Sequence, residues 1–398
     1  MKHHHSVAMV LSNTFATDTR VRREARGLSL KGFDVEILCW DRQGRRPSIE
    51  EVDGTLVRNM RLGRTTILAT SRVHYLIAAL LLQAIVFLWV IRKIGTVRTL
   101  FLHAHDFNTL LGSAAARWVA KNRVRLVYDC HELTPGVYKE WYGPVVSRVV
   151  ERIEFALLHG VDAVVAANDA ILGHLRQKTA VPAVSVYNCV SAYEIPEVSP
   201  TEAKRRLGLS GFFVILFAGR LRQDYDLDMI LEVAREMKRR GLSYFKFLFT
   251  GPPETVRYLA NAARVDRLQD LFDFRGWVRD ETVLWHYIAS DLCFAVTRSI
   301  GPNSDILTPV KLFESMACGL PVAVRERTLA AEIVRQWGCG IAVSSSHFLD
   351  QLLRLSKNPD LLRVLGAAGR EAFKSKYNWE RMQARLFWLY GELESSWV

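Results

Sequence analysis

Short apolar runs alternate with longer amphipathic stretches along the whole chain, and this alternation most constrains the fold. Runs rich in valine, isoleucine and leucine that are separated by helices predict a parallel sheet with helices on both faces. In the first half the runs are Ser6–Leu11, Val35–Trp40, Leu56–Met60, Thr99–His103, Val124–Tyr128, Ala163–Ala166 and Val184–Tyr187. In the second half they are Phe212–Phe217, Tyr244–Thr250, Leu271–Phe274, Leu292–Val296, Val322–Val324 and Gly340–Val343. The predicted fold class is therefore α/β, with two doubly wound (Rossmann-like) domains.

The alternation is interrupted once, at Ala192–Glu202, which contains two prolines and has no helical period. We interpret this segment as a linker. The predicted organisation is a first domain over 1–190, a linker over 191–203, a second domain over 204–376 and a final helix over 377–398. Ligands of doubly wound domains bind at the carboxyl ends of the strands, so a cleft between the domains is expected to hold the chemistry.

The chain is basic, with a formal charge of +12, of which +8 lies in the first 195 residues. This balance points to phosphorylated ligands or anionic lipid, with solubility alone as the alternative. No recognised motif or basic–aromatic pattern supports a nucleic-acid partner. The six cysteines form no C-x-x-C pair and have apolar neighbours, and no apolar secretory segment opens the chain. We therefore expect free thiols and a cytoplasmic location.

The segment Val73–Ile91 is 19 residues long and carries no formal charge. Its length only just reaches a membrane-spanning helix. It can be a buried core helix, an interfacial helix or a span, and the span fits least because strands of one sheet are predicted on both sides. A basic run precedes it and favours peripheral contact with an anionic membrane, the alternative being a solvated loop. The run comprises Arg42, Arg45, Arg46, Arg58, Arg61 and Arg64.

Polar residues follow the strands of the first half, where the cleft would be lined. They are Asn13, then His105 and Asp106, then His131 and Glu132. Imidazoles and carboxylates at strand ends can hydrogen-bond sugar hydroxyls or move protons. A metal site is the weaker interpretation, because a full ligand set cannot be counted from sequence, and we expect none. His103, inside the strand, is assigned to the core.

In the second half, Gly219-Arg220 and Gly251 follow two successive strands. A small residue permits close backbone approach, and an arginine binds a diphosphate in a bidentate manner. The stretch from Thr308 and Pro309 starts a helix with Lys311 and Glu314 in its first turns. A helix N-terminus beside a lysine is an anion site, and a glutamate can accept hydrogen bonds from ribose hydroxyls. A plain ion pair between the lysine and the glutamate is the alternative.

Several motifs in this order resemble the GT-B fold glycosyltransferases of family 4, the retaining group 1 transferases. The resemblance covers nearly the whole chain and is most specific over Pro309–Val322. The other motifs are Asp18–Ala25 with Leu30-Lys31-Gly32, His105-Asp106, Asp129–Leu133, Gly219-Arg220-Leu221, Gly251-Pro252, Gly276-Trp277-Val278 and Tyr377-Asn378-Trp379.

The resemblance implies roles for individual residues. Arg220 and Lys311 would hold the donor diphosphate and neutralise the leaving group, Glu314 would bind the ribose, and His131 would contact the sugar near the reacting carbon. Gly219, Gly251, Thr308 and Pro309 would complete the donor site. Two fixed cations at the departing phosphate would make a metal cofactor unnecessary. The donor would be a nucleotide sugar, and the acceptor a lipid-linked sugar or growing polysaccharide; the oligomeric state is unknown.

Two positions depart from the family pattern. Ile306, beside Asp305, stands where relatives carry a first glutamate, which leaves sugar recognition to backbone amides around 301–307. Tyr225 stands where a basic residue is usual, and Arg222 lies nearby as a substitute. These departures leave open a catalytically inactive partner, and a sugar-nucleotide epimerase is a more remote alternative.

Overall fold

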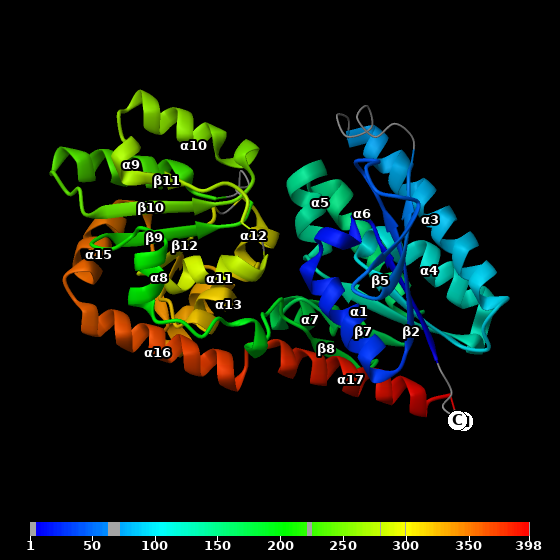
Figure 1. The fold of residues 1–398 in the computed structure, drawn as a ribbon. Helices are drawn as coiled ribbons and strands as arrows, with labels where there is room; N and C mark the ends of the chain where they lie inside the picture. Colours follow the sequence, from blue (N-terminus) through cyan, green and yellow to red (C-terminus); the bar gives the residue numbers. More distant parts are fainter. Residues whose placement is uncertain (1–4, 63–71, 221–224, 279, 299, 398) are drawn as a thin grey trace. The chain divides into compact units, whose positions relative to one another are not determined.

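The computed structural model describes residues 5–62, 72–220, 225–278, 280–298 and 300–397. Within them the chain forms two compact units, one of residues 1–188 with 382–398 and the other of residues 189–381 (Figure 1). Leu221 and Arg222 of the Gly-Arg-Leu region, and Arg64 of the basic run, lie outside the described residues.

Unit 1 is built on an eight-stranded sheet in the order β3-β4-β2-β1-β5-β6-β7-β8. Its strands are β1 Ser6–Leu11, β2 Asp34–Trp40, β3 Ile49–Val52, β4 Thr55–Met60, β5 Leu100–His105, β6 Val124–Cys130, β7 Ala163–Ala166 and β8 Ala183–Ser185. All pairs in the described sheet are parallel except β3–β4, an antiparallel edge that the apolar runs did not predict because β3 is largely exposed.

The helices of unit 1 follow its strands. They are α1 Thr19–Lys31, α3 Arg72–Ile94, α4 Phe107–Ala120, α5 Thr134–Tyr142, α6 Pro144–Leu158, α7 Asp169–Leu175 and most of α17 Trp379–Ser395. The strand order with right-handed crossovers predicts α3, α4 and α6 on one face of the sheet and α1 on the other, and α3 and α6 both contact α4. The last helix packs beside α1, where Gln383 closely contacts Gly27.

Unit 2 contains a six-stranded, all-parallel sheet in the order β11-β10-β9-β12-β13-β14 within the described residues. Its strands are β9 Phe213–Ala218, β10 Phe245–Thr250, β11 Phe272–Phe274, β12 Leu292–Ala295, β13 Val322–Arg325 and β14 Gly340–Val343. Its helices are α8 Pro200–Arg206, α9 Leu227–Arg239, α10 Pro253–Val265, α11 Asp280–Ile288, α12 Pro302–Ile306, α13 Val310–Cys318, α14 Leu329–Trp337, α15 Phe348–Ser356 and α16 Pro359–Ser375. The predicted α/β class with two doubly wound domains is confirmed.

Short 3-10 turns lie between some of these helices and strands. The 3-10 turns are η1 Phe15–Thr17, η2 Lys121–Arg123, η3 Ala192–Glu194, η4 Gln269–Leu271 and η5 Ser345–His347. The segment interpreted as an irregular linker, Ala192–Glu202, contains η3 and the start of α8. Ser191 and Glu194 close a capping box there, which orders the turn without an apolar period that the sequence pattern could show.

Helix α3 of unit 1 is buried along one side only in the described structure. Leu82, Val86 and Val90 are buried, whereas Leu80 and Leu81 are more than half exposed. The window Ile77–Ile94 is long and apolar enough to cross a membrane by length and composition, and 28% of it is buried. Helix α3 therefore packs on unit 1 along one side, as a core helix does, and exposes apolar side chains along the other side in the described structure.

Candidate functional site

A buried polar cluster surrounds the carboxylate of Asp129, at the end of β6. Its Oδ1 accepts a hydrogen bond from the guanidinium of Arg20 at 2.6 Å. Its Oδ2 lies 3.2 Å from Nε2 of His131 and 3.2 Å from Nδ1 of His105. One carboxylate thus organises an arginine and two histidines from three different segments.

The fold explains this convergence. His105 and Asp129 are register partners on the neighbouring strands β5 and β6, so their side chains share one sheet edge. Helix α1 begins at the N-cap Asp18 and presents Arg20 and Glu24 on one face, where Arg20 Nε donates to Glu24 Oε1 at 3.0 Å. The helix is therefore joined to the sheet by a buried ion-pair network.

Burial and neighbouring charges set the protonation states. Burial opposes the charge of His131, yet the carboxylates of Asp106 and Asp129 outweigh it and raise its pKa to about 10. Burial lowers the pKa of His105 to about 3. Burial, reinforced by the charge of Asp129, raises the pKa of Glu24 to about 8. Burial opposes ionisation of Asp129, but Arg20 and His131 hold its pKa well below the usual value. At neutral pH His131 is cationic, His105 is neutral and Glu24 is protonated.

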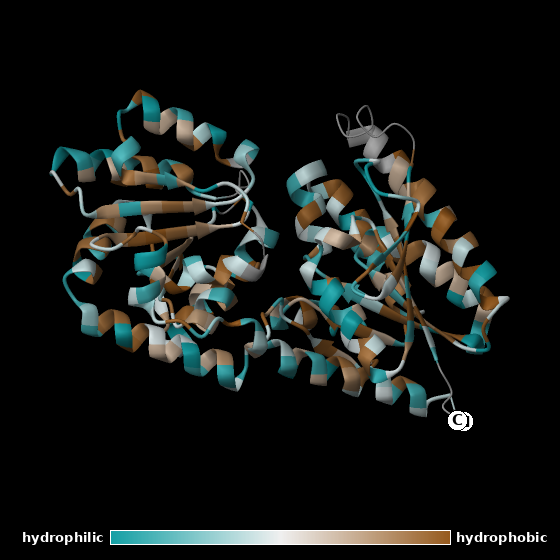
Figure 2. Ribbon diagram, viewed as in Figure 1, coloured by the Kyte–Doolittle hydropathy of each residue, from teal (hydrophilic) through white to brown (hydrophobic). Residues whose placement is uncertain are grey.

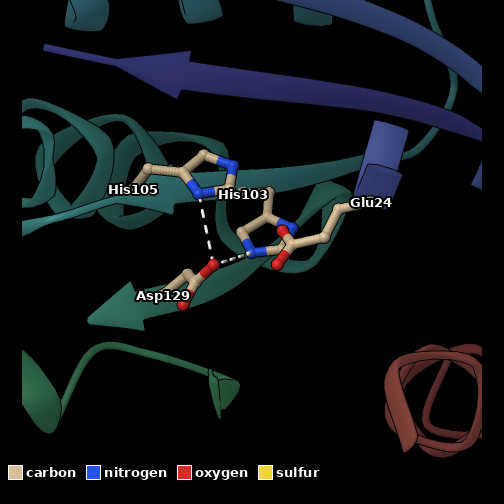
Figure 3. A group of neighbouring side chains, drawn as sticks. All are labelled: Glu24, His103, His105 and Asp129. Atoms are coloured by element: carbon tan, nitrogen blue, oxygen red, sulfur yellow. Dashed lines mark ion pairs between the residues drawn. The ribbon is translucent and has the colours of Figure 1, made fainter. Parts of the chain in front are cut away.

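Four residues in and beside this cluster could hold a metal ion by residue type. Glu24, His103, His105 and Asp129 are buried and bring one ligand atom each within 4.8 Å of one another (Figure 3). The guanidinium of Arg20, however, already donates to the carboxylate of Asp129 and to Glu24, whose raised pKa keeps a proton on its carboxyl group at neutral pH. A divalent cation beside this buried cation would be repelled, so the residues fit an ion-pair network better than a metal centre.

Only one histidine of the cluster reaches the surface. The side chain of His131 is 17% exposed, whereas those of His105 and His103 are 2% and 0% exposed. His103 hydrogen-bonds the hydroxyl of Tyr390 at 2.9 Å, as suits a core residue. His105 is buried and contacts Asp129 and His131 in the described structure, and its contact with a ligand stays a prediction.

Asp106 lies on the exposed side of His131. Its Oδ1 accepts from the backbone N–H of His131 at 3.0 Å, and its Oδ2 lies 3.8 Å from Nδ1. Its φ of 64° is in the left-handed region, a costly conformation for an aspartate that the surrounding bonds enforce. With Nε2 held by Asp129, Nδ1 is the atom of His131 that remains for a ligand.

The other predicted residues of unit 1 lie in different settings. Asn13 is exposed and donates to Asp18 at 3.1 Å, so it supports the cap of α1 and makes no hydrogen bond to the histidines in the described structure. Glu132 is partly buried directly after His131, where its carbonyl accepts from Cys130.

In unit 2, the ammonium group of Lys311 is buried without a carboxylate. Its side chain starts from the first turn of α13, and the residue is 8% exposed. Nζ donates to the hydroxyl of Tyr225 at 3.0 Å and lies 4.4 Å and 4.6 Å from the ring centres of Phe217 and Tyr225. No acidic partner pairs with it among the described residues, and Glu314 is bound instead by the hydroxyl of Tyr287. The alternative of a plain Lys311–Glu314 ion pair is therefore wrong.

A cavity of about 100 Å³ opens beside this lysine at the carboxyl ends of β9 and β10. Its lining includes Gly219, Thr250, Gly251, Trp277, Val278 and Glu314. A Cβ on Gly251 would lie 2.2 Å from the carbonyl oxygen of Gly219, so the absence of a side chain at Gly251 allows the ends of β9 and β10 to come this close. The structure thus brings Gly219, Gly251 and Glu314 together as donor-site candidates.

The remaining donor candidates border this region. Arg220 follows Gly219, is exposed and makes no hydrogen bond or ion pair with any described residue. Thr308 and Pro309 precede α13, and Pro309 is its N-cap rather than its first residue. A larger cavity, of about 420 Å³, lies near the ends of β12, β13 and β14 and is lined by Arg325 and Asp305 but by none of the predicted donor residues.

Several residues at these sites were missed from the sequence. The sequence patterns assign no site role to Arg20, Glu24 and Tyr287, which lie inside predicted helices, and they place Asp129 at a cleft-lining strand end without predicting its buried pairing. Burial of charged residues inside an amphipathic helix is invisible in a periodic pattern. The spacing of Arg20 and Glu24 by four residues was the one available signal.

Two family descriptions match the chain in succession. The description "Glycosyl transferase 4-like domain" matches residues 16–188, and "Glycosyl transferases group 1" matches residues 213–358. Each match falls in one structural unit.

A curated relative shares part of this sequence. It is the GDP-mannose-dependent alpha-(1-6)-phosphatidylinositol monomannoside mannosyltransferase of Mycobacterium tuberculosis, found in two strains. It is 25% identical over 191 residues, which are 46% of this chain and 49% of the relative. The chain therefore aligns with about half the length of the curated relative it matches.

Solved structures resemble the chain over its whole length. Sucrose-phosphate synthase of Thermosynechococcus elongatus aligns with a TM-score of 0.75 at 16% identity, covering 98% of this chain and all of the other. HepE of Anabaena in complex with UDP aligns with a TM-score of 0.70 at 14% identity, with the same coverage. At these identities the likeness concerns the fold, which is the GT-B fold. With the two family descriptions matched in order over this fold, the chain belongs to the group 1 glycosyltransferases with a 4-like N-terminal domain.

Proposed function

We propose that the chain transfers a sugar from a nucleotide-diphosphate sugar to a hydroxyl acceptor with retention at the anomeric carbon. The observation that carries the proposal is the buried ammonium of Lys311, which has no carboxylate partner in the described structure and lies 3.7 Å from the position of a Cβ on Gly219. A buried cation without an anion is costly, and a diphosphate supplies the missing charge.

The surrounding groups fit the other parts of such a donor. Glu314 lines the adjacent cavity, where its carboxylate can accept from ribose hydroxyls. Arg220 is exposed and unpaired in the described structure, so it is available as a second cation for the departing phosphate. Charge on the β-phosphate then develops against fixed cations, which supports a metal-independent reaction. The leaving phosphate itself would take the proton of the incoming hydroxyl.

His131 is the candidate contact for the transferred sugar or the acceptor. Its side chain is 17% exposed, and the imidazolium is held in place by Asp129 and Asp106. A fixed N–H donor binds a sugar hydroxyl without reorganisation at the moment of transfer.

The acceptor in this proposal is a lipid-linked sugar or growing glycan at the inner face of the cell membrane, with the protein in the cytoplasm. The matched curated relative acts on a phosphatidylinositol monomannoside, a glycolipid. The half-exposed apolar helix α3 is compatible with the interfacial interpretation of this segment.

Turnover of nucleotide sugars by purified Lys311→Ala and Glu314→Ala proteins tests the proposal. We expect both variants to lose transfer while keeping the melting temperature within a few degrees, because both side chains start from helix α13 and alanine favours a helix. The matched control is Lys357→Ala, an exposed lysine of the same unit. Near-normal turnover in both site variants would refute the assignment.

One observation favours a second candidate, an inactive donor-binding partner. Tyr225, which replaces the usual cation, already hydrogen-bonds Lys311, so the site has one charge fewer. Slow hydrolysis of the donor without acceptor separates the candidates, because an inactive partner binds the nucleotide sugar but never cleaves it.

A further inference from the structure

Three neighbouring helices cover one face of the sheet in unit 1. Helix α3 packs against α4, and α4 packs against α6. Each turns a buried stripe inward, including Val86 of α3, Leu110 of α4 and Val150 of α6. We call the opposite, outward side of α3, α4 and α6 the three-helix face.

The three-helix face exposes large apolar side chains along all three helices. On α3 they are Ile77, Leu80, Leu81 and Leu88, with exposed fractions from 49% to 66%; on α4, Leu111, Trp118 and Val119, from 43% to 81%; and on α6, Val145, Val149 and Ile153, from 41% to 70%. Figure 2 shows the apolar colour continuing along α3. Scattered apolar residues are ordinary on a surface, but matching stripes on adjacent helices mark a surface that is covered in use.

Among the described residues, the helices of this face carry exposed arginines and few acids, the most exposed being Glu151, whose side chain is 35% exposed. Residues 72–94 and 107–120 contain no aspartate or glutamate. Helix α6 has two, of which Glu154 is buried and bonded to Tyr128, while Glu151 is partly buried near His174. Arg92, Arg148 and Arg152 are exposed. A helix surface of aliphatic, tryptophan and arginine side chains suits the boundary between the headgroups and chains of an anionic bilayer.

We propose that the three-helix face docks on an anionic lipid bilayer and lies in its interfacial plane. This deepens the proposed function, because the surface adjoins the candidate acceptor site. Helix α4 begins directly after Asp106, whose carboxylate binds the backbone of His131. A membrane-held acceptor would thereby meet His131 beside the docked surface.

Sedimentation of the full chain with vesicles tests the docking surface. The probes are vesicles of phosphatidylcholine alone and of phosphatidylcholine with phosphatidylglycerol, at low and high salt. We expect the chain to bind the anionic vesicles at low salt. High salt should reverse this binding only in part, because apolar contacts persist when charges are screened. Failure of the wild-type chain to bind anionic vesicles at low salt overturns the proposal.

Matched variants locate the surface. Leu80→Asp, Trp118→Asp and Val149→Asp each place a charge at an exposed position of one helix, and each is expected to weaken vesicle binding by roughly tenfold or more. The controls are Leu30→Asp on α1 and Val265→Asp in unit 2, which are 77% and 81% exposed and lie off the three-helix face. Equal losses in variants and controls, or no loss in the variants, contradict the assignment.

Two further measurements separate the possible outcomes. A dimer in size-exclusion chromatography that Trp118→Asp dissociates, without vesicle binding by the wild type, would assign the face to self-association and overturn the proposal. Thermal stabilisation by nucleotide sugars is measured on the same variants and is expected to be unchanged. Vesicle binding by the wild type without stabilisation by nucleotide sugars would overturn the proposed function alone, and stabilisation without vesicle binding would overturn the docking proposal alone.

Discussion

The hydroxyl of Tyr225 lies 3.0 Å from the ammonium of Lys311 and holds it over the aromatic faces of Phe217 and Tyr225. Aromatic faces and one neutral oxygen orient a cation without cancelling its charge. The lysine therefore keeps its full charge for an anionic ligand.

Tyr225→Phe removes this hydrogen bond and leaves both rings in place. We expect roughly fivefold weaker binding of a nucleoside diphosphate, which corresponds to about 1 kcal/mol for one hydrogen bond. Isothermal titration measures it. Tyr258→Phe, an exposed tyrosine of the same unit that bonds Asp228, is the control and should leave the affinity unchanged. Unaltered affinity in Tyr225→Phe would show that the hydroxyl does not position the lysine.

Asp129→Asn removes the central anion of the buried network. Because Arg20 and His131 then lose their partner, we expect a loss of about 3–5 kcal/mol in the free energy of unfolding. The pKa of His131 should fall from about 10, which NMR titration of the imidazole detects. Asp162→Asn, at a less buried carboxylate that pairs with Arg117 in the same unit, is the control and should leave the His131 titration in place. An unchanged His131 titration in Asp129→Asn would remove Asp129 from its positioning role.

The stability of the fold should decline in alkaline solution. The pKa of Glu24 is raised from 4.5 to about 8 and that of His131 from 6.5 to about 10. A group whose pKa is raised by folding stabilises the fold fully at pH values below its pKa in the unfolded chain. This stabilisation is lost as the pH rises through its pKa in the folded protein. The stabilising contribution of Glu24 is therefore lost between pH 4.5 and 8, and that of His131 between pH 6.5 and 10. Between pH 6.5 and 10 the melting temperature should fall for the wild type, less steeply below pH 8 for Glu24→Gln and less steeply above it for His131→Gln. Identical slopes in all three proteins would contradict the assigned protonation states.

Gly251→Ala should disrupt the donor cavity. The new Cβ would lie 2.2 Å from the carbonyl oxygen of Gly219, which forces the ends of β9 and β10 apart. We expect a loss of about 1–3 kcal/mol and weaker donor binding, measured by urea unfolding and titration. Gly173→Ala in α7 meets no atom within 4 Å and should be neutral or slightly stabilising. A stable Gly251→Ala protein with normal donor affinity would show that this contact is dispensable.

The fold was largely predictable from local patterns. Strands such as β1 and β9 are buried along their full length, so their apolar runs are unmistakable. The edge strand β3 and the turn η3 escaped prediction because half-exposed strands and cap bonds leave no apolar period. Helix α5 was missed because it is short and begins immediately after the His131 strand end.

The sequence could predict only those candidate site residues that stand at the end of a strand or at the start of a helix. Lys311, Glu314, Gly219, Gly251 and His131 stand at strand ends or at a helix start, where the topology of a doubly wound sheet places ligands. His105 also stands at a strand end, but its side chain is buried in the structure, where it contacts Asp129, its register partner on β6.

The sequence alone determined the class of fold, its division into two doubly wound units and the strand ends at which polar chemistry gathers. Apolar periodicity and turn residues act locally, so they can be read along the chain. Tertiary structure alone decided that Arg20 and Asp129 form a buried pair, that Tyr225 holds Lys311, and that the outer side of α3 is left uncovered. These depend on contacts between residues as many as 109 positions apart, and their free energies arise from burial and charge that only packing creates.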